Sequence, residues 1–217
     1  MVVDPGEDDE EHLSTVAGCG PVALVLLTHR HHDHAGGARR FAELTGAPVR
    51  ALDPSLVLGS EALSDGDVIA AAGVELRVLS TPGHTSDSLC FLLDGPAADP
   101  VVLTGDTILG RGTTVIAHPD GALGPYLDSL RRLAELVPGT AVLPGHGPEL
   151  PDAPAAAQHY LAHREQRLEQ VRAALDRLGP DVTARQVVEL VYADVDRSLW
   201  RAAEWSVRAQ LDYLRSY

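Results

Sequence analysis

The densest group of metal-binding side chains in the sequence follows the apolar run 22–27. Four histidines and one aspartate lie in the six residues from 29 to 34. Neutral imidazole and carboxylate are good ligands for zinc and related divalent metals. The chain has only ten histidines in 217 residues, so a polar loop with unrelated histidines is the weaker interpretation of this cluster. The segment therefore predicts a metal site.

The spacing within the cluster divides it into two ligand groups. His29 and His31 are two residues apart, so both rings can point the same way in an extended turn. Asp33 and His34 are adjacent at the start of the helix expected next, and they can serve a neighbouring ion. Arg30 and His32 would then point away from the metals, and we expect them to have structural roles or to support the ligands from outside.

Three short glycine-containing motifs supply further ligand-type residues. The motifs PGHT, TGD and PGHG each follow a predicted strand, and they contribute His84, Asp106 and His146. Each motif alone is more typical of a turn, but all three in this order after a HxHxDH cluster form a strong combination. Glycine beside each candidate lets the backbone approach an ion closely.

This pattern resembles the ligand pattern of the metallo-β-lactamase superfamily over roughly residues 2–150. The resemblance implies an αββα sandwich with two Zn²⁺ ions at one edge of the sheets, with iron or manganese as alternative metals. It implies that the first metal is held by His29, His31 and His84. It implies that the second metal is held by Asp33, His34 and His146, and that the two are bridged by Asp106.

The same resemblance implies a hydrolase. A hydroxide shared by two metal ions would attack a carbonyl carbon or a phosphorus, with Asp33 and Asp106 as the catalytic residues. Class B antibiotic-hydrolysing enzymes usually have a cysteine at the position of Asp106, so penicillin-type substrates are not expected. The complete ligand set disfavours an inactive binding module. A redox diiron protein is disfavoured because His31 is not a carboxylate and no flavin domain is attached.

Two substrate classes remain open. The Asp4-Pro-Gly6 motif, the 110–114 loop and the helical C-terminus resemble the lactamase-like endoribonuclease branch. This implies an RNA phosphodiesterase, whose single-stranded RNA would meet tail arginines such as Arg164 and Arg167, and it is our first hypothesis. The alternative is a thioesterase or lactonase acting on a small ester or thioester, because glyoxalase II-like enzymes share the Asp/His site and the chain is strongly acidic.

The order of predicted elements indicates an α/β layered fold. Strands are expected at 22–27, 67–71, 74–80, 88–93, 101–104 and 141–143, a loop at 94–100, and helices at 35–44 and 123–137. The proline-rich segment 148–154 is the best boundary. The predicted domains are therefore a metal-binding hydrolase core over 1–154 and a small helical segment over 155–217, which the resemblance describes as winged-helix-like.

Composition narrows the remaining classes. The longest uncharged apolar run, 21–27, is far too short to span a bilayer, so no membrane partner is expected. The N-terminus does not resemble a secretory signal, and two cysteines without a CxxC motif favour a reducing cytoplasm. A net charge of −14 argues against holding nucleic acid through overall charge. A homodimer is compatible with the sequence.

One departure from the resemblance concerns the N-terminus. The family normally has two or three strands before the Asp4-Pro-Gly6 motif, whereas this sequence reaches the motif after three residues. We therefore expect an N-terminally truncated sandwich, through a truncated or misassigned start or an incomplete first sheet. The 2–3 strand would then present an unpaired edge, and we expect marginal stability. Asp4 itself is expected to fix a loop near the metals or to end a strand.

Overall fold

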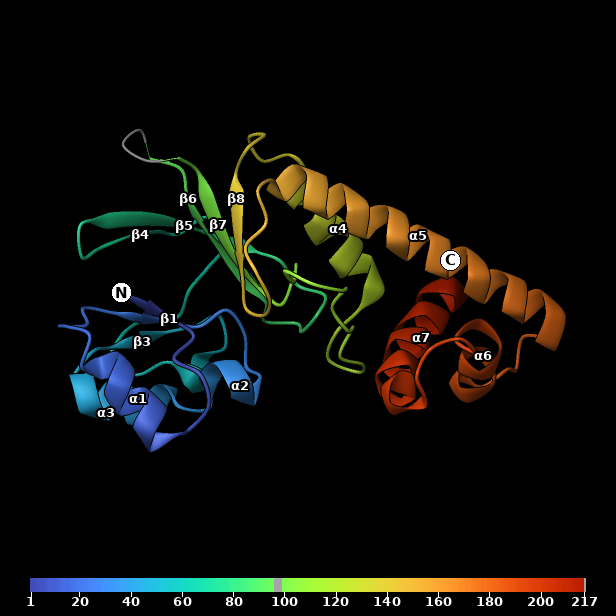
Figure 1. The fold of residues 1–217 in the computed structure, drawn as a ribbon, viewed down its shortest axis with the longest axis horizontal. Helices are drawn as coiled ribbons and strands as arrows, with labels where there is room; N and C mark the ends of the chain where they lie inside the picture. Colours follow the sequence, from blue (N-terminus) through green and yellow to red (C-terminus); the bar gives the residue numbers. More distant parts are fainter. Residues whose placement is uncertain (96–98, 217) are drawn as a thin grey trace.

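Two β-sheets face each other in the computed structural model, which describes residues 1–95 and 99–216 (Figure 1). The smaller sheet is parallel and has the order β1 (Val2–Val3), β2 (Val25–Leu26), β3 (Val49–Arg50). The larger sheet is mixed and has the order β4 (Val68–Ala71), β5 (Val74–Ser80), β6 (Leu89–Leu93), β7 (Val101–Gly105), β8 (Ala141–Pro144). The predicted 94–100 loop lies partly outside the described residues.

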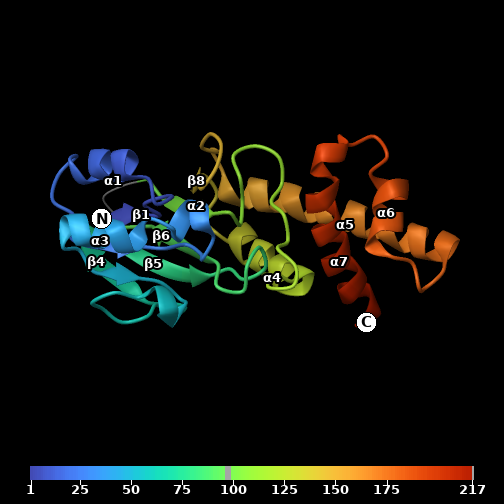
Figure 2. The ribbon, with the colours of Figure 1, turned by 90° about the horizontal axis from the view of Figure 1, so that it is seen from below.

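Helices cover the outer faces of both sheets (Figures 1 and 2). The smaller sheet is accompanied by α1 (Glu10–Ala17), α2 (His32–Ala35), α3 (Ala38–Thr45) and the short 3₁₀ helix η1 (Pro54–Leu56). The larger sheet is covered by α4 (Leu123–Ala134) and α5 (Ala153–Leu178). The remaining helices are α6 (Ala184–Val191), η2 (Arg197–Leu199) and α7 (Trp200–Arg215).

The layer order follows from how the apolar side chains divide. In β2, Val25 packs in the cluster that includes Leu13 of α1 and Phe41 of α3. The next residue, Leu26, packs in the cluster between the sheets, together with Phe91 of β6. A strand buried on both faces needs apolar residues at consecutive positions, which is why this stretch has no polar alternation. The predicted αββα sandwich is therefore confirmed.

The predicted helix over 35–44 is wrong in its extent, because two helices occupy this stretch. They meet at Gly36 and Gly37, and the backbone N–H of Gly37 donates to the carbonyl of Gly6 at 2.8 Å. A Cβ on Gly37 would lie 2.5 Å from the carbonyl oxygen of Glu7. The turn after β1 thus packs directly on this glycine pair, and the contact requires the break. The helix predicted to reach residue 137 ends at Ala134.

The C-terminal part is helical throughout, since residues 153–216 are all described and contain no strand. Helix α5 starts within the predicted boundary segment and belongs to two cores. Its N-terminal half contributes Ala157 and Tyr160 to the core under the larger sheet. Its C-terminal half contributes Val171 to a core shared with α6 and α7. None of the helices in the described residues is long and apolar enough to cross a membrane.

We predict that the capping box of α6 stabilises the tail. The Thr183 hydroxyl accepts a hydrogen bond from the Gln186 backbone N–H, and the Gln186 side chain accepts one from the Thr183 backbone N–H. Thr183→Ala should lower the free energy of unfolding by about 1 kcal/mol. The chain's two tryptophans, Trp200 and Trp205, both lie in α7, so fluorescence during urea unfolding reports on the tail. Thr183→Ser keeps the hydroxyl and is the control. An equal decrease in the free energy of unfolding for both variants would contradict the prediction.

Candidate metal centre

The strand directions bring the candidate ligands to one edge of the larger sheet. Strands β5 and β7 both run antiparallel to β6, and β8 runs parallel to β7, so these three strands share one direction. Their C-terminal ends meet at one edge, where the chain continues to His84, Asp106 and His146. The smaller sheet delivers its cluster to the same place, because the Leu89 backbone N–H donates to the carbonyl of Thr28 at 2.8 Å.

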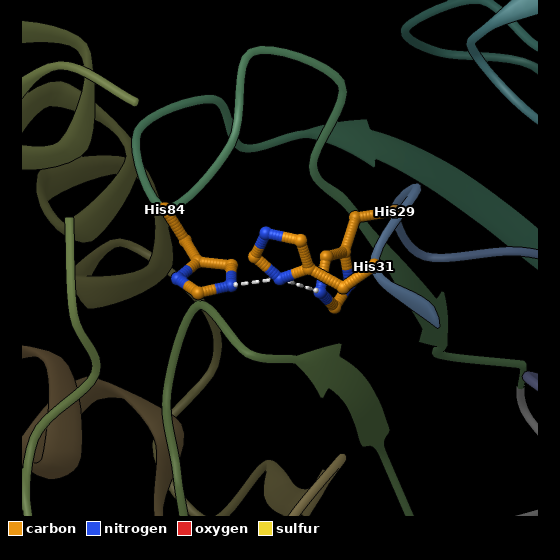
Figure 3. A group of neighbouring side chains, drawn as sticks. All are labelled: His29, His31 and His84. Atoms are coloured by element: carbon orange, nitrogen blue, oxygen red, sulfur yellow. Dashed lines mark hydrogen bonds between the residues drawn. The ribbon is translucent and has the colours of Figure 1, made fainter. Parts of the chain in front are cut away.

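Three histidines form the first group of facing side chains (Figure 3). The Nδ1 atom of His31 lies 3.0 Å from Nε2 of His29 and 3.0 Å from Nε2 of His84. Two nitrogen ligands on a tetrahedral zinc ion lie roughly 3.3 Å apart, given Zn–N bonds of about 2.05 Å. The nitrogens of these three rings therefore lie at separations close to those that a shared ion requires.

Asp33, His34 and His146 form the second group. The Nε2 atom of His146 lies 3.1 Å from Oδ2 of Asp33 and 3.3 Å from Nε2 of His34. His34 is 3% exposed, whereas the Asp33 and His146 side chains are 43% and 50% exposed. The second group is thus the side of the cluster that opens to solvent.

The Asp106 carboxylate lies between the two groups. Its Oδ1 is 3.4 Å from Nε2 of His34 and 3.6 Å from Nε2 of His146, and its Oδ2 is 3.7 Å from Nε2 of His84. Oδ1 is buried and has no hydrogen-bond partner within the described part of the chain. A buried carboxylate oxygen without a partner is costly. This orphaned oxygen and the facing imidazoles fit a pair of divalent metal ions.

The outer nitrogen of His84 is already engaged. Its Nδ1 lies 2.6 Å from the carbonyl oxygen of Val115 and 3.0 Å from Oγ1 of Thr114. A carbonyl can only accept, so Nδ1 carries the hydrogen and Nε2 of the neutral ring keeps its lone pair. The free lone pair faces the cluster, which is the arrangement found in histidines that bind metals.

Asp4 fixes two other rings in the same way. Its Oδ2 accepts hydrogen bonds from Nδ1 of His34 at 2.8 Å and from Oγ1 of Thr28 at 2.6 Å. Since the Thr28 hydroxyl donates to Asp4, it can only accept from Nδ1 of His29, 3.0 Å away. Both histidines therefore direct Nε2 inward. Asp4 also lies close enough to these rings to be a ligand, but it accepts from the outer nitrogen of His34 and reaches His29 only through Thr28.

Burial and mutual charge set the protonation of the metal-free cluster. Burial, helped by the charge on neighbouring imidazoles, lowers the pKa of His29 to about 2. Burial also opposes a charge on His34, but Asp106 and Asp4 outweigh it and raise the pKa of that ring to about 10. Burial opposes ionisation of Asp106, but the neighbouring His34 ring outweighs it and lowers the pKa of this carboxyl to about 2. The metal-free site thus holds a proton on His34 between two carboxylates, and a ligated metal would replace its Nε2 proton.

The two remaining polar side chains of the 29–34 segment, Arg30 and His32, lie outside the two groups of facing ligands, as the sequence predicts. The His32 side chain is exposed and belongs to neither group of facing ligands. The Arg30 guanidinium lies 3.2 Å from the buried Asp87 carboxylate, and it also approaches Asp53 and Asp120 at 3.6 and 3.5 Å. Arg30 thus joins the first ligand loop to the loop that carries His84.

Sequence reasoning missed the contacts that hold this cluster from the helical side. Arg164 was expected to meet RNA phosphates, but it is 4% exposed and donates a hydrogen bond to the carbonyl of Thr114. That expectation is wrong for this arginine, because helix α5 turns it into the protein. Arg167 is partly buried, with its guanidinium carbon 4.8 Å from the centre of the Tyr192 ring. No local motif links Thr114 to Arg164, since the two are 50 residues apart.

We predict that Gly145 must stay without a side chain. A Cβ there would lie 2.7 Å from Oδ1 of Asp106 and 2.7 Å from Cε1 of His34. Gly145→Ala should displace both ligands, lower the metal content measured by elemental analysis, and destabilise the fold by about 1–3 kcal/mol. Gly95→Ala is the matched control, because no atom of the residues that the structure describes lies within 4 Å of its Cβ position. Normal metal content in Gly145→Ala would contradict this close packing.

Comparison with known proteins agrees with this geometry. A family model described as the metallo-beta-lactamase superfamily matches residues 1–146, and one described as a beta-lactamase associated winged helix domain matches residues 183–216. The second match supports the winged-helix-like C-terminus.

Two fungal relatives are similar over most of the chain. The lactamase-like protein adaB of Aspergillus niger is 35% identical over 82% of this chain and 56% of its own length. The atrochrysone carboxyl ACP thioesterase of Aspergillus fumigatus is 37% identical over 72% of this chain and 48% of its own length. The chain thus spans about half the length of these relatives.

Solved structures extend the similarity to nearly the whole chain. A metallo-beta-lactamase family protein from Thermus thermophilus superposes with a TM-score of 0.79 at 26% identity, covering 99% of this chain and 84% of the other. The protein TTHA1623, solved in a di-iron-bound form, gives a TM-score of 0.56 at 30% identity, covering 69% and 82%. The chain belongs to the metallo-beta-lactamase superfamily.

Proposed function

We propose that the chain is a dinuclear metal-dependent hydrolase. The observation that carries this proposal is the Asp106 carboxylate, whose two oxygens face different groups of candidate ligands. The first ion would be held by His29, His31 and His84, and the second by Asp33, His34 and His146, with Asp106 common to both. Zinc suits this histidine and carboxylate set, and iron is the alternative that the di-iron relative supports.

A bound pair of divalent ions supplies a hydroxide nucleophile at neutral pH and polarises the substrate oxygen. The chain's own residues hold and orient the reactants. Asp33 is 43% exposed at the open side of the cluster, so its carboxylate can accept a hydrogen bond from the attacking water. Asp4 and Val115 keep the ligand rings oriented by accepting their Nδ1 hydrogens. Such partners determine how well a metal site works.

A small ester or thioester is the substrate class that the cavity favours. A cavity of about 200 Å³ lies beside the second ligand group, and its lining combines Asp33 and His146 with apolar side chains such as Val3, Leu103 and Leu143. No arginine is among the lining residues of this cavity in the described structure. This lining suits an acyl group better than the sugar–phosphate chain of RNA. The relative named as an acyl carrier protein thioesterase supports the same class.

RNA cleavage is the second candidate. The match of residues 183–216 to a winged helix domain supports it, as do Arg172 and Arg177, which are exposed on α5 and form no ion pair within the described residues. It is weakened by the burial of Arg164 and by the net charge of −14. We therefore rank it below the thioesterase.

We predict that replacing Asp106 removes a metal ion. Purified protein should contain close to two divalent ions per chain, and Asp106→Ala should retain about one and lose at least roughly 100-fold in activity on a small thioester. The control is Asp128→Ala, since Asp128 lies on α4 with its side chain 77% exposed. Elemental analysis showing full occupancy in Asp106→Ala would contradict the bridging role.

We predict that the two substrate classes separate under one pair of assays. The protein should hydrolyse an acyl-cysteamine thioester, and its affinity for single-stranded RNA should be weak and insensitive to Arg172 and Arg177. If both arginines contact phosphates, the double variant Arg172→Gln/Arg177→Gln would flatten the slope of log affinity against log salt by about 1.4. If that change is observed, and the protein cleaves RNA but does not turn over the thioester, the nuclease hypothesis would replace the thioesterase hypothesis.

A further inference from the structure

Two side chains of α5 reach from the helical part of the molecule to the loop between Asp106 and Thr114. Tyr160 and Arg164 are four residues apart, so they lie on one face of the helix. Both are buried, and this face is turned towards the metal centre. Neither residue belongs to the candidate ligand set that the sequence predicts.

Arg164 is held in an unusual environment for an arginine. Its guanidinium carbon lies 5.2 Å from the centre of the Tyr126 ring, and its Nε is buried without a hydrogen-bond partner. Within residues 1–95 and 99–216 it forms no ion pair with a carboxylate. A buried charge without a counter-ion is costly unless its contacts are well made. The hydrogen bond that Arg164 donates to the Thr114 carbonyl is therefore a strong constraint on that peptide.

The peptide that Arg164 fixes adjoins the one that orients His84. The Thr114 hydroxyl oxygen lies 3.0 Å from Nδ1 of His84, and the next carbonyl, of Val115, lies 2.6 Å from the same nitrogen. A single residue thus separates the guanidinium contact from the acceptor of the ligand ring. A shift of the Thr114 carbonyl would turn the Val115 carbonyl and release the His84 ring.

The other end of the same loop is held by two tyrosines. The Tyr126 hydroxyl donates to the carbonyl of Thr107 at 2.8 Å, directly after Asp106. The Tyr160 hydroxyl accepts from the Leu109 backbone N–H at 2.9 Å. The loop is therefore fixed near Asp106 by the tyrosines and near His84 by Arg164, which leaves it little freedom to relax if one contact is lost.

We propose that Arg164 is a positioning residue of the metal centre, acting on His84 through the Thr114–Val115 backbone. The inference rests on the proposed metal centre but not on its substrate. It assigns to α5 the role of holding the first ligand group, so that Arg164 supports metal binding in place of the RNA contact expected from it. The second ligand group meets the same loop at another point, where the Gly110 backbone N–H donates to the carbonyl of His146 at 2.9 Å.

The test is a titration of metal-free protein with Co²⁺. Calorimetry measures the affinity of each binding step, and visible absorption reports the coordination of the bound ion. We expect Arg164→Met to weaken one of the two binding steps by about 10–100-fold, to alter the absorption of that site, and to leave the other step unchanged. Arg164→Lys keeps a charged donor but loses the planar guanidinium group. Its Co²⁺ affinity at the weakened step should therefore fall between that of Arg164→Met and that of the native protein. The matched control is Arg167→Met, one turn further along α5, which should bind both ions normally.

Each outcome decides a different question. Native protein that binds fewer than two ions would overturn the proposed function, whereas two normal binding steps in Arg164→Met would overturn this inference alone. Equal losses in Arg164→Met and Arg167→Met would also overturn it, because they would reflect general weakening of the helix. If Arg164→Met does not fold, Arg164→Gln is the deciding variant, since it keeps a polar group but is too short for the Thr114 carbonyl. Unchanged Co²⁺ affinity in that variant would overturn the positioning role.

Discussion

The hydrogen bonds accepted by Asp4 determine the direction of two candidate ligand rings, those of His29 and His34. This carboxylate lies just after β1, where its backbone adopts a left-handed φ of 50°, a conformation that aspartate tolerates better than most residues. Its backbone N–H donates to the carbonyl of Leu26 at 2.9 Å, so the pairing of β1 with β2 sets the position of the carboxylate. The side chain then orients His34 directly and His29 through Thr28. Sheet pairing and ring orientation are thus one connected system.

The convergence of the candidate ligands could be predicted because most of them follow strands. A ligand at a strand end needs only the strand direction to find its place, and the apolar runs and glycine motifs show where each strand stops. The close approach of Gly145 to Asp106 is the physical reason for one such glycine. The break between α2 and α3 was less visible, because it depends on a contact with the Asp4-Pro-Gly6 turn, far away in sequence.

The role of α5 could not be predicted, for a reason specific to arginine. Arginine side chains are mostly exposed, so a sequence analysis assigns them to the solvent side of a helix. Here Tyr160, Arg164, Leu168 and Val171 follow the helical repeat along one buried face, and Arg164 is 4% exposed. Its acceptor is a backbone carbonyl, which has no signature in the sequence. The aromatic ring beside it belongs to α4, whose packing against α5 only the folded structure reveals.

The continuity of α5 across two cores has a consequence for synthesis on the ribosome. All the candidate ligands precede the helix in the chain, and they emerge before Arg164 does. Since chains are made from the N-terminus and domains fold as units during synthesis, the ligand loops can gather before the contact that steadies them exists. A nascent chain at that stage would have its histidines assembled but the 107–115 loop still free on one side. Completion of α5 would then be the step that turns a loose cluster into a rigid one.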